Sequence, residues 1–410
     1  MKLSFPTAVL SACAVALLTI AGWSLWPKSK GKLSVLVILD TVRAQNTSVC
    51  GYARPTTPTL ERLVHEGAHI NCDAWAPGSW TLPTHASFFT GLEVPEHHAH
   101  LVDRAAEKET EGVRNLGPAR GLSADAVTLA DQRPSLLVSG NPVLGDASGL
   151  NQGFRYSHTG LKFGDTYDDD FVVALTEALS TANDGDLLVL NIADAHQPWT
   201  DIPDGVEWVP PTKAIKYRYR QKKGLWRRWH MGDRDEKQRQ RIVDLYDYAI
   251  FCADRTLGKA LDAIEQQDFS IDHLTITSDH GEHVGEHNLL GHGHYLTEEN
   301  QRVPLISTEP LPDGPISATV VYDLALGNEP VARPVRAVSY PHRTRSGWFT
   351  EQGLFGQTRA RSWSPELEWS SPQPVPDGDF GQFIDRAKKS GIATSDESDL
   401  EERLEALGYL

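Results

Sequence analysis

The chain has 410 residues, of which 40% are hydrophobic, and its 55 acidic and 39 basic side chains give a formal net charge of −16. A chain of this length can bury a large core, either as one large α/β domain with an appendage or as two domains. The acidic balance argues against a general nucleic-acid-binding protein. Cys13 lies in an N-terminal apolar segment, and the other three cysteines (Cys50, Cys72 and Cys252) are an odd number, which predicts no disulfide framework.

The N-terminal apolar segment, residues 5–26, carries no charge and has Lys2 before it and three lysines shortly after it. It is long enough to span a bilayer or to act as an uncleaved signal-anchor. By the positive-inside rule, the lysines that follow it would hold the rest of the chain in the cytoplasm.

Short apolar runs alternate with helical stretches in the following part of the chain. We expect strands at residues 33–39, 135–140, 187–193 and 275–277, and helices at 57–64, 81–90, 171–182 and 238–265. In the first helix, Thr57 is the expected N-cap before Pro58. Near-continuous apolar strands separated by helices indicate a parallel sheet covered on both faces.

Two stretches fall outside this alternation. Residues 101–120 are charged and unpatterned, which predicts a loop. Residues 213–229 are basic and aromatic, and one interpretation is a solvated surface helix. The other is a patch that meets anionic lipid head groups or steers an anionic substrate, with Trp226 and Trp229 at the interface.

Past Pro304 the pattern weakens. Proline and glycine become frequent, and a few β-like runs such as residues 318–322 appear. An amphipathic helix is expected to close the chain at residues 400–410. We expect this tail to form a small subdomain that packs against the main one.

Three of the expected strands end in an acidic residue, namely Asp40, Asp194 and Asp279. Ligands bind beyond the carboxyl ends of the strands in parallel sheets, so these carboxylates should meet at one edge. His280 directly follows the third, and the stretch from there holds five histidines (280, 283, 287, 292 and 294). Carboxylate and imidazole together suit zinc, manganese or iron. For any one of these histidines, the alternative is a polar surface loop.

Thr81 is expected at or near the N-terminus of a helix that Gly91 closes. A hydroxyl at this position sits in the positive end of the helix dipole, which favours both an alkoxide and a bound oxyanion. The alternative is an ordinary threonine N-cap.

The chain resembles the sulfatase family of the alkaline phosphatase superfamily, in motifs whose order and spacing match. These motifs are residues 39–43, 51–52, 58–60, 80–91, 151–154, 194–199, 278–286 and 302–305. The resemblance implies an alkaline-phosphatase-like α/β/α sandwich with a mostly parallel central sheet and a small C-terminal subdomain. The expected division is residues 1–32 as anchor or signal segment, 33–310 as catalytic domain and 311–410 as the subdomain.

The resemblance also implies a site. Asp40, Asp279 and His280 would hold a metal that contacts the nucleophile at Thr81. Sulfatases oxidise a Cys or Ser to formylglycine at this position, which threonine does not allow, and His85 stands in place of an arginine. Thr41 stands where sulfatases often carry a second calcium-binding Asp, and His280 where many carry Asn. Both differences favour zinc or manganese over calcium.

A threonine nucleophile with Asp-His ligands is similar to the phosphodiesterase and phosphoethanolamine-transferase branches of the superfamily, which often use two metals. We expect one metal site. Asp194, His196 and either His292 or His294 are the candidates for a second metal or for the substrate anion.

The expected function is a metal-dependent hydrolase of phosphate or sulfate esters, with His85, His196 and His292 as candidates to bind the anion or protonate the leaving group. The alternatives are a membrane-bound phosphotransferase acting on lipid head groups, a formylglycine-independent sulfuric ester hydrolase and a non-catalytic homologue. The resemblance implies a catalytic domain anchored through residues 5–26 on the periplasmic or extracellular side, and the lysines keep the cytoplasmic side as the alternative. The sequence does not predict the substrate or the oligomeric state.

Overall fold

The computed structural model describes residues 29–101, 119–161, 167–203, 206–215, 229, 234–293, 296–331, 333, 335–339, 345–350 and 353–356. The expected membrane segment at 5–26, most of the expected loop at 101–120, Trp226, His294 and the closing helix at 400–410 lie outside these residues. Within the described ranges, no helix combines the length and the apolar character needed to cross a membrane.

The centre of the fold is an eight-stranded sheet in the order β12-β2-β11-β8-β1-β7-β5-β6. Only β11 runs antiparallel to its neighbours, and the other described pairings in this sheet are parallel. The expected mostly parallel sheet is therefore confirmed. Its strands are β1 (Gly31–Leu39), β2 (His69–Trp75), β5 (Ser135–Ser139), β6 (Tyr156–Thr159), β7 (Leu187–Ile192), β8 (Phe269–Thr277), β11 (Arg302–Ser307) and β12 (Ile316–Ser317).

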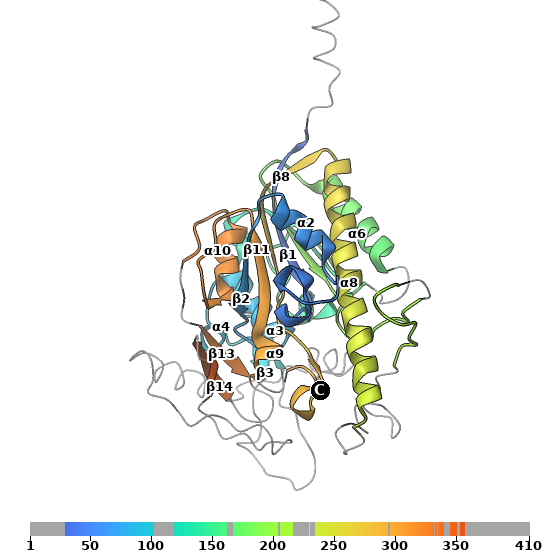
Figure 1. Cartoon of the computed structure of the whole chain (residues 1–410). Coiled ribbons are helices and arrows are strands. Elements are labelled where there is room, and N and C mark those ends of the chain that lie inside the picture. Colours follow the sequence, from blue (N-terminus) through green and yellow to red (C-terminus); the bar gives the residue numbers. More distant parts are fainter. Residues whose placement is uncertain are drawn as a thin grey trace, which may run out of the picture.

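Helices cover both faces of this sheet, as Figure 1 shows. One face carries α2 (Pro58–His65), α6 (Tyr167–Thr181) and α8 (Glu236–Gln266), and the other carries α3 (Thr81–Thr90), α4 (Val94–His97) and α10 (Val321–Ala325). Alternate residues of β1 enter different cores, Val35 and Val37 on the α8 side and Leu36 and Ile38 on the α3 side. Because strand side chains alternate with a period of two, a strand buried on both faces reads as a continuous apolar run.

Smaller elements surround this sandwich. The short helices are α5 (Leu129–Gln132), α9 (Glu298–Gln301) and the 3-10 turns Ala44–Asn46, Ser48–Cys50, Pro142–Leu144, Asp146–Ser148, Glu286–Asn288 and Ala318–Val320. Two-stranded sheets pair β3 (His100–Leu101) with β4 (Ala119–Arg120) and β9 (His283–Val284) with β10 (Leu290–Gly291), and β13 (Arg336–Ser339), β14 (Arg345–Thr350) and β15 (Gly353–Gly356) form an antiparallel sheet.

One local expectation about secondary structure is wrong. The β-like run at 318–322 is helical, because the Ser317 hydroxyl accepts the Thr319 N–H as an N-cap and the buried apolar side chains pack on the sheet from a helix. Tertiary packing here overrides β-propensity. Thr57 is the N-cap of α2, before Pro58, as expected, although its hydroxyl accepts the Val49 N–H and makes no capping bond to the helix.

Two further expectations about side chains are also wrong. Cys50 and Cys72 form a disulfide, and Cys252 is the free, buried cysteine that made the count odd. Their spacing in sequence gave no signal, because β2 brings Cys72 to the turn that holds Cys50. Trp229 is only 2% exposed and belongs to the α8-side core, so it does not form part of a surface patch.

Candidate metal centre and nucleophile

The carboxyl ends of β1 and β8 bring three potential ligands together. Asp40 directly follows β1, while Asp279 and His280 lie just after β8, the strand that pairs parallel with β1. One ligand atom from each of the three lies within 4.8 Å of the others, and all three side chains are fully buried. Helix α3 begins at Thr81, as expected, and directs its first residue at this group.

Hydrogen bonds fix the protons of the group. The His280 Nδ1–H donates to the carbonyl of Gly281 at 2.9 Å, so Nε2 carries a lone pair. This Nε2 lies 3.3 Å from Asp279 Oδ2 and accepts the Thr81 hydroxyl at 3.5 Å. The backbone N–H groups of Thr41 and His280 donate to Asp279 Oδ1. Among the described residues, Asp40 Oδ1 and Asp279 Oδ2 have no hydrogen-bond partner.

Buried oxygens without donors are costly, and a bound cation would satisfy them. Two carboxylate oxygens, one imidazole nitrogen and a neighbouring hydroxyl form a mixed oxygen and nitrogen donor set. Such a set fits zinc or manganese better than calcium, which prefers six to eight oxygens. The residues present therefore fit a divalent metal.

The pKa values follow from the same burial. Burial, together with the charge of Asp40, raises the pKa of Asp279 well above its usual value. Burial would also raise the pKa of Asp40, but His196, His280 and the Asn141 amide lower it overall. Burial and the neighbouring His292 hold the pKa of His280 well below its usual value, so its Nε2 keeps its lone pair at neutral pH.

Asn141 contacts both the nucleophile and a ligand. Its Oδ1 accepts the Val143 N–H at 2.9 Å, which fixes the orientation of the amide. The Nδ2 group therefore faces inward and donates to Asp40 Oδ2 at 2.9 Å and to Thr81 Oγ1 at 3.3 Å. Asn141 was not predicted as a site residue, although it lies just past the expected strand at 135–140, at the same edge of the sheet.

Asn191 is a second amide that the sequence analysis missed, because it lies inside an apolar run. It donates to Asp40 Oδ2 at 3.2 Å and to His85 Nε2 at 3.4 Å. His85 lies one turn after Thr81 on α3, is fully buried and donates its Nδ1–H to the Thr81 carbonyl at 3.0 Å. Burial lowers the pKa of His85 to about 4, so the imidazole is neutral at neutral pH.

His196 and His292 lie beside this centre. The His292 ring is 4.4 Å from that of His280 and 5.2 Å from that of His196. The His292 Nδ1–H donates to Glu282 Oε2 at 3.1 Å, and the His196 Nδ1–H donates to the Gln197 carbonyl at 2.6 Å. Burial holds the pKa of His292 well below its usual value, so with Nδ1 as the donor its neutral ring carries the Nε2 lone pair, the form that binds metals.

Glu282 belongs to the same group and was missed, although it follows the Asp-His-Gly run directly. It is fully buried, burial raises its pKa to about 7, and its Oε1 has no partner among the described groups.

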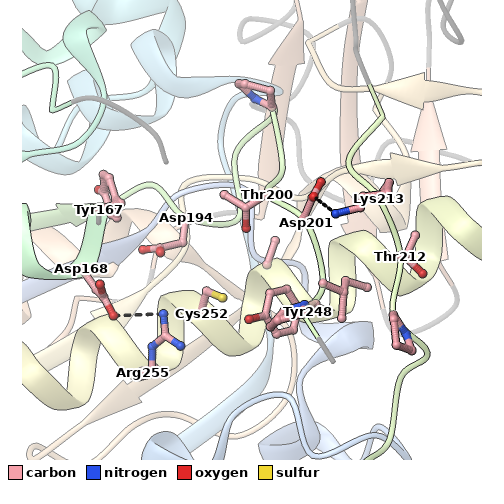
Figure 2. Close-up of a pocket in the computed structure, with 15 residues that line it drawn as sticks. Tyr167, Asp168, Asp194, Thr200, Asp201, Thr212, Lys213, Tyr248, Cys252 and Arg255 are labelled. Atoms are coloured by element: carbon pink, nitrogen blue, oxygen red, sulfur yellow. Dashed lines mark hydrogen bonds and ion pairs between the residues drawn. The ribbon is translucent and has the colours of Figure 1, made fainter. Parts of the chain in front are cut away.

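Asp194 is placed differently from the other acidic residues. Figure 2 shows its side chain between Tyr167 and Cys252, in a cavity of about 680 Å³ that Tyr248 and Arg255 also line. Burial raises its pKa to about 7. In the described part of the chain, the group that fits a metal by distance is Asp40, Asp279 and His280, without Asp194.

Comparisons with known proteins identify the family of the chain. Residues 32–311 match the model of the family described as Sulfatase. Phosphoethanolamine transferase EptA of Escherichia coli O157:H7 is 23% identical over 297 residues, which are 68% of this chain and 46% of that protein. The chain thus spans about half the length of this curated relative.

Solved structures share the fold at low identity. The phosphonate monoester hydrolase of Agrobacterium radiobacter superposes with a TM-score of 0.57 at 14% identity, over 80% of this chain and 87% of that one. The C-terminal periplasmic domain of phosphoethanolamine transferase EptC from Campylobacter jejuni gives 0.51 at 17%, over 73% and 89%. The zinc complex of the corresponding EptC domain from Escherichia coli gives 0.51 at 15%, over 80% and 92%. The expected α/β/α sandwich is therefore confirmed.

Proposed function

Because this chain belongs to the sulfatase family, we propose that it is a metal-dependent enzyme that cleaves phosphate esters through Thr81. The observation that carries this proposal is the position of the Thr81 hydroxyl, 3.5 Å from His280 Nε2, in a group whose two carboxylates each have an oxygen that lacks a donor. A hydroxyl in this position can lose its proton when a cation neutralises the carboxylates.

Asp40, Asp279 and His280 would hold the ion. When bound, a divalent zinc or manganese ion supplies positive charge that favours the threonine alkoxide and polarises the ester. Asn141 donates its amide hydrogen to Thr81 Oγ1, which stabilises negative charge on that oxygen. The N-terminus of α3 adds the positive end of its dipole.

Thr81 attacks phosphorus in line with the leaving oxygen. The bond from Oγ1 to phosphorus forms while the bond to the leaving alcohol breaks, and the leaving oxygen takes a proton. The resulting threonine ester is then cleaved by water, which releases phosphate and restores the hydroxyl.

His196, His292 and Glu282 form the neighbouring part of the site. Together they offer nitrogen and oxygen donors of the kind that hold a second divalent cation. In protonated form, the same imidazoles can instead donate to the leaving oxygen.

The first test is hydrolysis of matched 4-nitrophenyl phosphate monoester, phosphodiester and sulfate ester, after chelation and re-addition of zinc, manganese or calcium. We expect phosphoester turnover with zinc or manganese, a rate within about tenfold in Thr81→Ser, and loss of at least a thousandfold in Thr81→Ala. Preference for the sulfate ester would instead support a formylglycine-independent sulfuric ester hydrolase, and calcium dependence would overturn the metal assignment.

A second candidate is transfer of the phosphoryl group to an acceptor hydroxyl instead of water. The similarity to phosphoethanolamine transferase EptA over 68% of this chain favours it. The experiment is mass spectrometry of the protein after incubation with phosphoethanolamine-bearing lipid vesicles. An ethanolamine phosphate adduct on Thr81, discharged by an added sugar acceptor but stable in water, would establish the transferase and overturn the hydrolase.

We also propose that the catalytic domain is exported and anchored through residues 5–26. The Cys50–Cys72 disulfide supports this, since disulfides persist in oxidising compartments and are rare in the cytosol. Alkylation of the full chain with a thiol reagent under denaturing conditions should modify only Cys252 and Cys13 before reduction. Modification of Cys50 and Cys72 without reductant would favour the cytoplasmic side.

A further inference from the structure

The turn that follows Asp40 has a backbone conformation that its sequence disfavours. Thr41 has a φ of 63°, in the left-handed region. β-Branched residues rarely adopt this region because the branched side chain crowds the backbone, and such residues persist only where surrounding contacts hold them. The contacts that hold Thr41 therefore decide the direction of Asp40 and of the Thr41 N–H.

The Thr41 conformation matters to the metal centre directly. The Thr41 N–H donates to Asp279 Oδ1 at 3.1 Å, which turns the other oxygen of that carboxylate toward Asp40 and His280. If Thr41 returned to an extended conformation, this N–H would rotate away and Asp279 would lose one of its two backbone donors at Oδ1.

Tyr246 holds this turn from the opposite side. Its hydroxyl donates to the Thr41 carbonyl at 2.6 Å and accepts the Arg43 N–H at 3.1 Å. The single hydroxyl of Tyr246 thus holds both the carbonyl of Thr41 and the N–H of Arg43. Val42 completes the turn by donating its N–H to Ser278 Oγ at 2.9 Å.

The Tyr246 ring has little freedom to move. It is fully buried on α8, the Trp199 ring lies 5.5 Å from it, and the Arg43 guanidinium lies over it at 5.5 Å. Helix α8 extends over 31 residues and packs along the sheet, so the hydroxyl is presented from a rigid element.

We propose that Tyr246 is a positioning residue for the metal centre, whose hydroxyl holds Thr41 in the left-handed conformation that keeps Asp40 and Asp279 converged. This inference rests on the metal centre of the proposed function. Tyr246 does not touch the ion, and it acts through Thr41 and Asp279.

The test measures zinc affinity of the full chain by competition with a chromophoric chelator, without substrate. Removing an outer hydrogen bond of a metal site typically weakens metal affinity 10- to 100-fold. We expect this loss in Tyr246→Phe. Tyr248→Phe is the matched control, since that hydroxyl lies two residues further along the same helix and lines the separate cavity of Figure 2. It should bind zinc within about twofold of the native chain.

A rescue separates positioning from general damage. Glycine adopts positive φ without a steric penalty, so Thr41→Gly should make the Tyr246 hydroxyl dispensable. We expect the Tyr246→Phe/Thr41→Gly double variant to match Thr41→Gly in zinc affinity within about twofold. This comparison also holds if Tyr246→Phe alone does not fold.

Two results would overturn the inference while the proposed function stands. One is native zinc affinity in Tyr246→Phe, and the other is a tenfold or larger gap between the double variant and Thr41→Gly. If the native chain itself does not bind zinc or manganese, the metal centre of the proposed function fails, and the positioning role fails with it.

Discussion

Replacing Asp279 with asparagine should have opposite effects on stability in the metal-free and the metal-bound protein. Asparagine keeps the Oδ1 acceptor for the N–H groups of Thr41 and His280. It replaces the Oδ2 atom, 3.3 Å from the His280 Nε2 lone pair, with an amide that can donate to that nitrogen. The metal-free variant therefore no longer needs to bind a proton at this position, and its amide can still donate to the buried His280 nitrogen.

The magnitude follows from the separation of the carboxylates. Oxygens of Asp40 and Asp279 lie within 4.8 Å of each other, where two unit charges repel by about 3 kcal/mol at an effective dielectric constant of 20. Burial and Asp40 raise the pKa of Asp279, so the folded metal-free protein binds a proton that the unfolded chain has released. Its stability therefore falls as the pH rises from the unfolded pKa of about 4 toward the folded value.

Asp279→Asn lacks this dependence. In chelator-treated protein at pH 8 we expect the variant to be more stable than the native chain by up to about 3 kcal/mol, with the difference shrinking toward pH 4. Urea unfolding with and without zinc measures it, and zinc should reverse the order because the variant has lost a charged ligand. A metal-free variant less stable than the native chain at pH 8 would refute the repulsion argument.

Three further predictions concern the support of the site and the fold. Asn141→Leu removes the amide that donates to Thr81 Oγ1, so kcat for 4-nitrophenyl phosphate should fall about a hundredfold or more while KM changes little. An equal rise in KM would contradict the stabilisation of the Thr81 oxygen by Asn141. Burial lowers the pKa of His85 to about 4, so the imidazole stays neutral between pH 5 and 9. The pH–rate profile of His85→Gln should therefore keep the native shape over this range. A limb of the profile that disappears in the variant would assign His85 a proton-transfer role. The Cys50–Cys72 bridge closes a loop with a separation of 22 residues, so the double alanine variant should be about 3 kcal/mol less stable than the native chain in urea unfolding. An unchanged free energy of unfolding would show that the bridge does not restrict the unfolded chain.

The sequence predicted the parts of the site that local patterns define. Apolar runs ending in Asp40 and Asp279 placed both carboxylates at one edge, because parallel strands share the position of their carboxyl ends. The start of α3 at Thr81 followed from the proline and closing glycine around it. The sulfatase likeness stated from these motifs is confirmed by the match over residues 32–311.

Which residues reach the site depends on the side of a strand end that each side chain faces. Asn191 points into the site from within an apolar run, and Asp194, three residues on, points into the cavity of Figure 2. The backbone path after β7 determines the directions of these two side chains, and the periodicity of the sequence does not predict that path. The disulfide was missed for a related reason. An odd number of cysteines does not show which of them is unpaired, and only the structure shows that Cys252 lies buried on α8.

The pairing of β1 with β8 also determines when the ligand set can exist during synthesis. Asp40 emerges from the ribosome far ahead of Asp279 and His280, and the three meet only once the two strands lie side by side. A nascent or translocating chain therefore cannot yet bring these three residues together, and metal binding by them would be coupled to completion of the sheet. An ion held by these three residues would then be selected by the supply in the compartment where β8 joins β1.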